Sequence, residues 1–191
     1  MKTFQLIFLS STLFAFGQAS FTDVTKESGI DNIYDVYQGL FGGGVVAFDF
    51  DNDGFEDLYI TGGKSQDVLY KNNGDGTFTD VIDESGLLKD RVVVTTGVSS
   101  ADVNKDGYID LLITTIASED NKTMKKKTLS PNLLYINNGD GTFTDVSSKF
   151  GLTKNNFSTS SSFGDINADG YPDLFIGNYF KNFYFEDSPF G

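Results

Sequence analysis

Three short apolar runs set the pattern of this chain, and each follows directly on a stretch rich in Asp, Asn and Gly. The runs are LYIT at 58–61, LLIT at 111–114 and LFIG at 174–177. They are short, contain β-branched and aromatic residues, and are bounded by Gly or Asn, which favours strands over helices. The pattern therefore predicts a repeated β-structure.

One period of the sequence predicts four antiparallel strands. In the first copy we expect them at 43–50, 58–62, 68–72 and 77–82. The last two flank the turn NNGDG, whose Asn-Gly and Asp-Gly pairs supply the positive φ angles of a tight hairpin. The strand after the turn reads TFTDV and alternates like a half-buried edge strand.

The period recurs along the chain. The second copy spans 92–146 and carries a polar insertion at 118–131, and the third copy begins near Phe157. Four-stranded repeats of this length are typical of propeller blades. We therefore predict an all-β fold, a β-propeller of four-stranded antiparallel blades that is incomplete, with about two and a half blades.

The two ends of the repeat region are expected to be complementary. FTDVTKESGI at 21–30 matches the last strand of a blade, FTDVIDESGL at 78–87 and FTDVSSKFGL at 143–152. In a closed propeller such a strand completes the last blade. After Phe180 the third copy lacks both the NNGDG turn and the FTDV strand. We expect a fragment of a longer propeller, and the alternative is a small open sheet with unpaired edges.

The first residues read as a secretory signal peptide. Lys2 is a short basic region, 4–16 is apolar, and Gly17 and Ala19 precede a cleavage site before Ser20. The alternative, a membrane anchor, would need roughly 20 apolar residues. We expect a secreted or cell-surface protein without membrane insertion after cleavage. The expected division is signal peptide 1–19 and propeller repeats 20–191, with a closing strand in 20–38, blade 1 at 39–87, blade 2 at 88–152 and partial blade 3 at 153–191.

The stretches that precede the apolar runs share a template of nine positions: DFDNDGFED at 49–57 (loop 1), DVNKDGYID at 102–110 (loop 2) and DINADGYPD at 165–173 (loop 3). In a tight turn, the side chains at positions one, three and five converge, and Gly at position six permits the positive φ that closes the curve. The carbonyl at position seven and the carboxylate at position nine complete the oxygen shell that Ca²⁺ prefers. The candidate ligands at about three calcium sites are Asp49, Asp51, Asp53, Phe55, Asp57, Asp102, Asn104, Asp106, Tyr108, Asp110, Asp165, Asn167, Asp169, Tyr171 and Asp173.

Electrostatics favours a cation in these loops. Two carboxylates about 4 Å apart repel by roughly 4 kcal/mol at an effective dielectric near 20, and loop 1 carries four carboxylates at its ligand positions. The alternatives are solvated turns and an EF-hand, which needs an acid at position twelve and flanking helices, where this chain has Ile60, Ile113 and Ile176. The side chain of Lys105, at position four of loop 2, is expected to point to solvent.

The NNGDG turns offer a further set of oxygens. Turn chemistry alone explains their residue types, although a second ion is an alternative. The residues concerned are Asn72, Asn73, Asp75, Asn137, Asn138 and Asp140.

Composition narrows the function. The net charge of −13 arises largely from Asp, and the one basic run is 125–127, so a nucleic-acid partner is not expected. The chain contains neither Cys nor His. Disulfides, thiolate metal sites and most catalytic triads are therefore not expected.

The repeated D-x-[DN]-x-D-G-x-x-D loops, the LY-x-NNGDGTFTDV hairpins and the opening FTDVTKESGI resemble FG-GAP (VCBS-type) repeats, particularly those of bacterial proteins similar to cartilage acidic protein (ASPIC/UnbV type). The resemblance covers about 21–180. It implies a propeller, usually of seven blades, with calcium in the nine-position loops, and roles in adhesion or in binding proteins and carbohydrates outside the cell. The Gly-Ala-Pro slot of the family reads Gly62-Gly63 or Gly177-Asn178 here, and the family's C-terminal ASPIC/UnbV module is not in the sequence.

These observations predict a secreted, calcium-binding and non-catalytic module whose partner is an extracellular protein or carbohydrate. We expect the calcium face to be structural and the opposite face, with Lys122 and 125–127 in the insertion, to bind the partner. The alternative is the propeller part of a secreted polysaccharide-degrading enzyme, a lyase or hydrolase accessory domain. In that case Tyr34, Tyr37 and Tyr179 could line a channel or groove.

Overall fold

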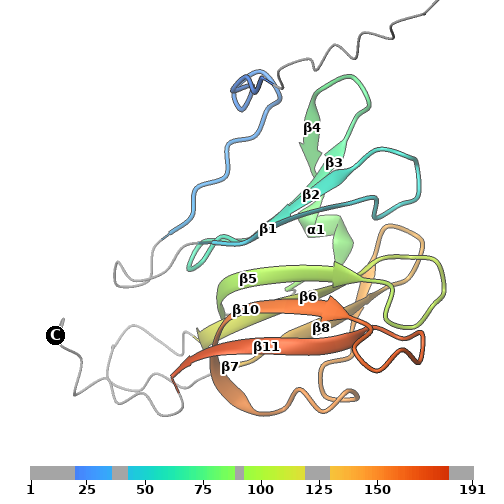
Figure 1. Cartoon of the computed structure of the whole chain (residues 1–191). Helices are drawn as coiled ribbons and strands as arrows, with labels where there is room; N and C mark the ends of the chain where they lie inside the picture. The colour runs from blue at the N-terminus through green and yellow to red at the C-terminus, as the bar shows by residue number, and fades with distance from the viewer. Residues whose placement is uncertain (1–19, 36–42, 89–92, 119–129, 181–191) are drawn as a thin grey trace, which may run out of the picture.

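The computed structural model describes residues 20–35, 43–88, 93–118 and 130–180, and in it three β-sheets lie side by side (Figure 1). The two complete sheets share one strand order, and all neighbouring strands are antiparallel. The first consists of β1 (Val45–Phe48), β2 (Asp57–Ile60), β3 (Val68–Asn72) and β4 (Phe78–Asp80). The second consists of β5 (Val93–Ala101), β6 (Asp110–Ser118), β8 (Leu133–Asn137) and β9 (Phe143–Asp145). The predicted all-β fold of four-stranded antiparallel blades is confirmed.

The third sheet is smaller and includes a short strand from blade 2. Its order is β11 (Asp173–Phe180), β10 (Asn155–Gly164) and β7 (Ser130–Pro131). β7 is the end of the polar insertion of blade 2, and it pairs antiparallel with the start of β10 through Pro131 and Asn155. The sequence did not predict this pairing. It ties the connection between β6 and β8 to the neighbouring blade.

Each nine-position loop is closed by the register of the two strands that flank it. Phe48 pairs with Asp57, Ala101 with Asp110, and Gly164 with Asp173. The residue before position one therefore always lies opposite position nine. This register holds both ends of every loop at the same distance from the sheet.

The core lies mainly between the first two sheets. Tyr59, Leu69, Leu111 and Leu133 are fully buried in one cluster that draws on both sheets. Phe50 of loop 1 crosses to blade 2, and its ring centroid lies 6.3 Å from that of Phe143 (the other residues of the cluster are Phe48, Ile82, Leu87, Ile113 and Tyr135). Burial of this apolar area is the main force that holds the blades together.

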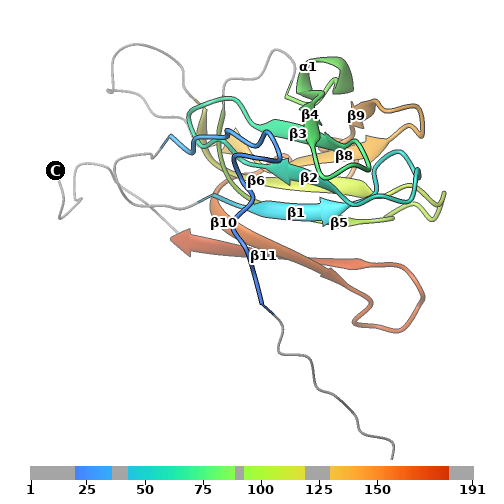
Figure 2. The same cartoon turned by 90° about the horizontal axis from the view of Figure 1, so that it is seen from above.

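The first strands of the three sheets lie next to one another. Seen from above, β1, β5 and β10 are neighbours (Figure 2). A Cβ placed on Gly44 would lie 2.9 Å from the Cα of Gly97, and a Cβ on Gly97 would lie 2.8 Å from the carbonyl oxygen of Thr159. The sheets therefore approach backbone to backbone at their inner edge.

The N-terminal segment differs from the predicted strand. Residues 20–24 form no strand, and the Phe21 side chain is 99% exposed. In the blades, this sequence pairs with a third strand, as when the Val81 amide donates to the Leu69 carbonyl. No such partner strand for 20–24 is present in the described parts of the chain. The closing of a ring by this segment remains a prediction.

The turn that follows FTDV is nevertheless the same in all three copies. It contains helix α1 (Ile82–Ser85) in blade 1, which the sequence did not predict, and a left-handed Gly follows in each copy. The turn docks on the next blade: the Leu88 amide donates to the Tyr135 hydroxyl at 3.1 Å, and the Asp31 amide donates to the Tyr70 hydroxyl at 3.2 Å. Residues 24–31 therefore occupy on blade 1 the place that 81–88 occupy on blade 2.

The structure separates the turns of the described residues onto two sides of the sheets, whereas a partner-binding role for the side opposite the loops remains a prediction. The nine-position loops and the NNGDG turns lie together on one side, at the right of Figure 1. The turn after β2 lies on the other side, where Asp35 forms a bridge with Gly63. Lys122 and 125–127, like Tyr37 and the expected signal peptide, lie outside the described residues. Over the described ranges, no helix combines the length and apolarity needed to cross a membrane.

Candidate metal loops

Position one folds each loop by accepting two backbone hydrogen bonds. Asp49 Oδ1 accepts from the Asp53 amide at 3.0 Å, and Asp49 Oδ2 accepts from the Gly54 amide at 2.8 Å. Asp102 and Asp165 make the same pair of bonds in loops 2 and 3. The position-six Gly has φ between 87° and 90° in all three loops, as the sequence predicts.

Position four also has positive φ, which the sequence analysis missed. The angle is 57° at Asn52, 62° at Lys105 and 61° at Ala168. Asn tolerates this left-handed conformation best, whereas Lys and Ala adopt it at some energetic expense. The Asn at position four of loop 1 was the only available signal. Two left-handed residues separated by one position curl the chain tightly around the side chains at positions one, three and five.

Positions three and five contact each other. In loop 2, the Asn104 amide nitrogen donates to Asp106 Oδ2 at 2.7 Å, and in loop 3, Asn167 donates to Asp169 Oδ2 at 3.0 Å. The other oxygen of each position-five Asp accepts the backbone amide of position seven. These bonds lower the pKa of Asp169, chiefly through the Tyr171 amide.

Position nine is a buried anchor. Asp57 and Asp110 are fully buried. Asp110 Oδ1 accepts from the Asn137 amide at 2.9 Å, and Oδ2 accepts from the Val103 amide at 2.8 Å. Burial raises the pKa of Asp110 to about 6 and raises that of Asp57, although the amide donors act in the opposite direction. A cation bound beside such a carboxylate would favour its charged form.

Loop 1 gathers its carboxylates most tightly. One oxygen each of Asp49, Asp51 and Asp57 lies within 4.8 Å of the others, and among the described residues no other group of acidic side chains converges so closely. Asp51 Oδ1 is buried and has no hydrogen-bond partner. Asp53 lies apart from this group. It accepts the Phe55 amide and, together with Asp51, contacts the Lys71 ammonium.

The Lys71 ammonium is a cation placed where these negative charges meet. It lies 2.8 Å from Asp53 Oδ2 and also bonds Asp51 Oδ2. Its hydrogen bonds to Asp51 and Asp53 raise the pKa of Lys71 above its usual value, and the bond to Lys71 lowers the pKa of Asp53. The sequence does not indicate the contact of Lys71 with loop 1, because strand β2 separates the two along the chain.

The aromatic residue at position seven packs on the NNGDG turn of its own blade. A Cβ on Gly74 would lie 2.9 Å from the Phe55 ring, and a Cβ on Gly139 would lie 2.6 Å from the Tyr108 ring. The first Gly of the turn therefore makes room for the ring. The proposed ligand role of the position-seven carbonyls remains a prediction.

The oxygens of the NNGDG turns are engaged within the turns. Asn72 Oδ1 accepts from the Gly74 amide, and Asp75 Oδ1 accepts from both the amide and the hydroxyl of Thr77. The bonds to Thr77 lower the pKa of Asp75. The second turn repeats these bonds through Asn137, Asn138, Asp140 and Thr142. Turn chemistry therefore accounts for these residues, as expected.

Neighbouring loops contact one another through position four. The Asn52 amide nitrogen donates to the Gly107 carbonyl of loop 2 at 3.2 Å. The Lys105 ammonium lies 3.8 Å from the centroid of the Tyr171 ring in loop 3. The expectation that the Lys105 side chain simply points to solvent is therefore wrong. Although Lys105 is exposed, the left-handed backbone at position four directs its side chain toward the next blade.

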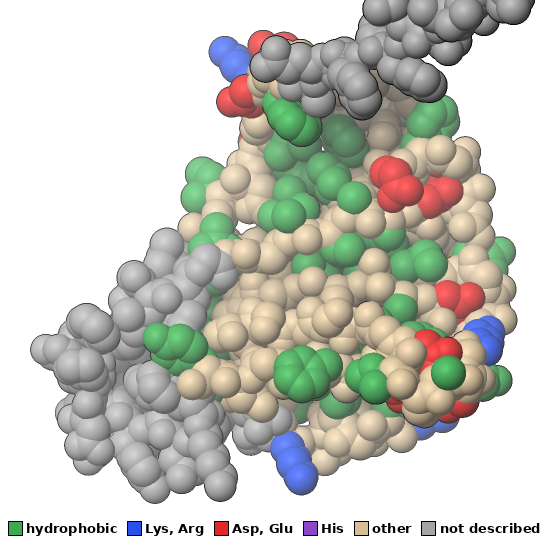
Figure 3. Space-filling view, in the orientation of Figure 1, with side chains coloured by type: hydrophobic (Ala, Val, Ile, Leu, Met, Phe, Trp, Pro, Cys, Tyr) green, Lys and Arg blue, Asp and Glu red, His purple; other side chains and the backbone are tan. Residues whose placement is uncertain are grey.

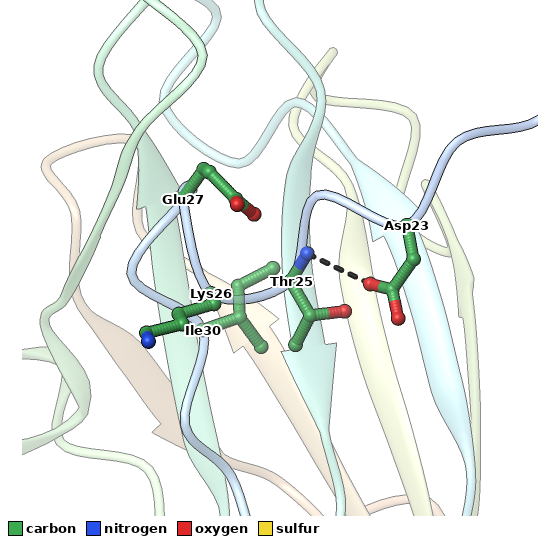
Figure 4. Close-up of a pocket in the computed structure, with 5 residues that line it drawn as sticks. All are labelled: Asp23, Thr25, Lys26, Glu27 and Ile30. Carbon is green, nitrogen blue, oxygen red and sulfur yellow. Dashed lines mark hydrogen bonds between the residues drawn. The ribbon is translucent and has the colours of Figure 1, made fainter.

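The surface reflects this arrangement. Figure 3 shows acidic side chains along the edge where the loops of Figure 1 lie, with lysines among them. A hollow elsewhere is lined by Asp23, Thr25, Lys26, Glu27 and Ile30 (Figure 4). There Asp23 accepts the amide of Thr25 in its own turn, and the exposed residues of this single turn form no converging set of donors.

Two of the tyrosines that could line a groove in an enzyme, Tyr34 and Tyr179, belong to the described residues, and Tyr37 does not. The Tyr34 hydroxyl donates to the Thr95 carbonyl at 3.3 Å. Tyr179 is 59% exposed on β11, where its ring lies 6.2 Å from that of Phe157. Their positions give no indication of a shared acid and base.

Repeated four-stranded blades, with an Asp-rich loop between the first two strands, define a class of propeller-like repeat proteins. Comparison with known families agrees: the FG-GAP-like repeat matches residues 49–113 and 115–176. The chain belongs to the FG-GAP-like repeat family, whose repeats imply a propeller-like fold. No curated protein matches the chain in sequence.

Proposed function

We propose that this chain is part of an exported, calcium-stabilised propeller that binds an extracellular protein or carbohydrate and has no catalytic activity of its own. The observation that supports the calcium role most directly is the convergence of three carboxylates in loop 1, with a buried Asp51 oxygen that has no partner. Loops 2 and 3 repeat the same hydrogen-bonded curl.

The donor set fits Ca²⁺. Hard oxygen ligands from carboxylates, Asn amides and backbone carbonyls are those that Ca²⁺ prefers, and no soft ligand is present. In loop 2 the residues that would hold the ion are Asp102, Asn104, Asp106, Asp110 and the carbonyl of Tyr108. When bound, calcium supplies positive charge that offsets the repulsion among these groups.

The family and the architecture both support the proposed binding role. FG-GAP repeats commonly mediate extracellular binding or adhesion, and a rigid scaffold with exposed loops suits recognition. We propose the bacterial ASPIC/UnbV-type proteins as the particular relatives, on the basis of the LY-x-NNGDGTFTDV hairpins and the opening FTDVTKESGI. Export through cleavage before Ser20 is part of the same proposal.

Calcium should stabilise the fold. Because a ligand that binds only the native state adds RT ln(1 + [L]/Kd), calcium at about 100 times Kd adds about 2.7 kcal/mol per site. We expect the melting temperature of the chain to rise in millimolar calcium and to fall again when chelator is added. A melting curve that neither addition moves would contradict the calcium role.

A pair of variants locates the effect. Asp106→Asn removes a charge from loop 2, so the calcium-dependent rise in melting temperature should shrink. Asp140→Asn makes the same change in the NNGDG turn of that blade, where an amide oxygen can still accept the two bonds from Thr142. Its calcium response should match that of the wild type.

Incubation with polysaccharides tests the non-catalytic role: new reducing or unsaturated ends would reveal an enzyme.

A further inference from the structure

At its ligand positions one, three, five and nine, loop 1 carries one more carboxylate than each of the other two loops. Position three is Asp51 in loop 1, whereas it is Asn104 in loop 2 and Asn167 in loop 3. Positions three and five of loop 1 are therefore both negatively charged. Without a group between them, Asp51 and Asp53 would repel each other.

The group between them comes from β3. Lys71 is paired with Thr79 in the blade 1 ladder, and the equivalent residue of blade 2, paired with Thr144, is Ile136. The Lys71 ammonium contacts both Asp51 and Asp53 and lies 6.0 Å from the centroid of the Phe50 ring. Its side chain is 34% exposed, so the contact is partly shielded from water.

In loops 2 and 3 the side-chain amide of the position-three Asn is the donor to position five, and it carries no charge. It donates to the position-five carboxylate at 2.7 Å in loop 2 and 3.0 Å in loop 3. In loop 1, Lys71 supplies the donor together with a full positive charge on a flexible tether. A divalent cation that enters loop 1 must share the carboxylates with this ammonium or displace it.

We propose that Lys71 is a tethered competitor of calcium, which makes loop 1 the weakest calcium site of the three and lets blade 1 keep its loop conformation when calcium is absent. This inference rests on the proposed calcium function of the loops. It gives the repeats different roles: loops 2 and 3 respond to the calcium concentration, and loop 1 is held largely by the Lys71 side chain of β3 in the same blade.

Exchange of the two residues tests the inference. Calorimetric titration with Ca²⁺ is carried out on the wild type, on Lys71→Ile, which introduces the blade 2 residue, and on Ile136→Lys, which introduces the blade 1 residue. We expect Lys71→Ile to tighten the weakest site by about tenfold, and Ile136→Lys to weaken one of the tighter sites by a similar factor. In chelator, Lys71→Ile should melt at a lower temperature than the wild type, and calcium should abolish this difference.

A second substitution covers the case in which Lys71→Ile does not fold without calcium. Lys71→Gln keeps an N–H donor of the kind that Asn104 provides and removes only the charge, so it should also tighten the weakest site. If the wild type binds calcium and both Lys71 variants give the same isotherm as the wild type, the inference is overturned. If the wild type and all variants bind no calcium, the proposed function itself fails.

Terbium luminescence assigns the affected site. Position seven is Tyr108 in loop 2 and Tyr171 in loop 3, and both can sensitise bound Tb³⁺, whereas loop 1 has Phe55. In a Phe55→Tyr background, Lys71→Ile should add a component to the terbium signal at lower Tb³⁺ concentration. Equal titration curves with and without Lys71→Ile in this background would contradict the assignment to loop 1.

Discussion

At the scale of single residues, one buried carboxylate joins blade 1 to blade 2. Asp67 Oδ1 accepts from the Gly62 amide at 2.7 Å and the Thr95 hydroxyl at 2.6 Å, and Oδ2 accepts from the Tyr59 hydroxyl at 2.6 Å. Thr95 belongs to β5 of the next blade. In blade 2 the same place is taken by Asn132, which donates to the Ser158 hydroxyl of β10. The contact between blades is therefore repeated with a different side chain.

Removal of Asp67 should destabilise the protein strongly. Asp67→Ala leaves three buried donors without their acceptor, so we expect a loss of about 3 kcal/mol or more in the free energy of unfolding. Asp67→Asn keeps an oxygen for Gly62 and Thr95 and should lose only about 1 kcal/mol. Urea denaturation of the two variants measures the difference. Equal losses would show that the hydrogen bonds of Asp67 do not hold the blades.

The contribution of Asp67 to stability depends on pH with a defined sign. Burial raises the pKa of Asp67 above 3.8, so between 3.8 and the raised value the folded state binds more protons than the unfolded state. The contribution of Asp67 to stability therefore falls as pH rises through that window. The stability of the wild type relative to Asp67→Asn should decrease from about pH 4 upward and then level off. A difference that increases with pH would contradict this assignment.

At the scale of the elements, the loops act as a connected row because position four of one loop contacts the next. The sequence predicted the four strands of a blade and the nine-position template from apolar runs and Asp spacing. It did not predict these contacts. The left-handed backbone of Lys105 sets the direction of its side chain, and the residue type Lys does not indicate such a backbone conformation. Helix α1 and strand β7 were missed for a related reason, since both depend on packing against a neighbouring blade.

A double-mutant cycle can measure the contact between loops 2 and 3. We expect Lys105→Ala and Tyr171→Ala to show a coupling energy of about 0.5 kcal/mol, the size of an exposed cation–π contact. The matched cycle of Lys105 with Tyr108 of its own loop, whose ring packs on the turn at Gly139, should give a coupling near zero. If the two cycles give equal values, Lys105 does not link the loops.

At the scale of the whole molecule, the inner edges of the sheets set how closely the blades stand. β5 lies between β1 and β10, and Gly97 contacts backbone on both sides. A side chain here would have to push blade 3 away, because the nearest atom of that blade, the Thr159 carbonyl oxygen, belongs to the backbone. The spacing of the blades therefore depends on small residues at this point of the first strand.

Gly97→Ala should loosen the packing of blade 2 on blade 3. The added methyl group would lie 2.8 Å from the Thr159 carbonyl oxygen, so we expect a loss of about 2 kcal/mol in the free energy of unfolding. Gly164→Ala is the control, because a Cβ at Gly164 meets no atom within 4 Å, and it should change stability by less than about 0.5 kcal/mol. Chemical denaturation of both variants tests this, and a neutral Gly97→Ala would argue against close approach of the strands.

The docking of the first two FTDV turns on the following blade also bears on protein engineering. A domain cut out at the edges of a sheet would leave its outer strands without the cap that the preceding repeat provides, here through Asp31 on Tyr70 and Leu88 on Tyr135. A graft of blade 2 into another scaffold should therefore begin at Val81 rather than at Val93. The unit that can be transplanted is one sheet together with the turn that follows FTDV in the preceding repeat.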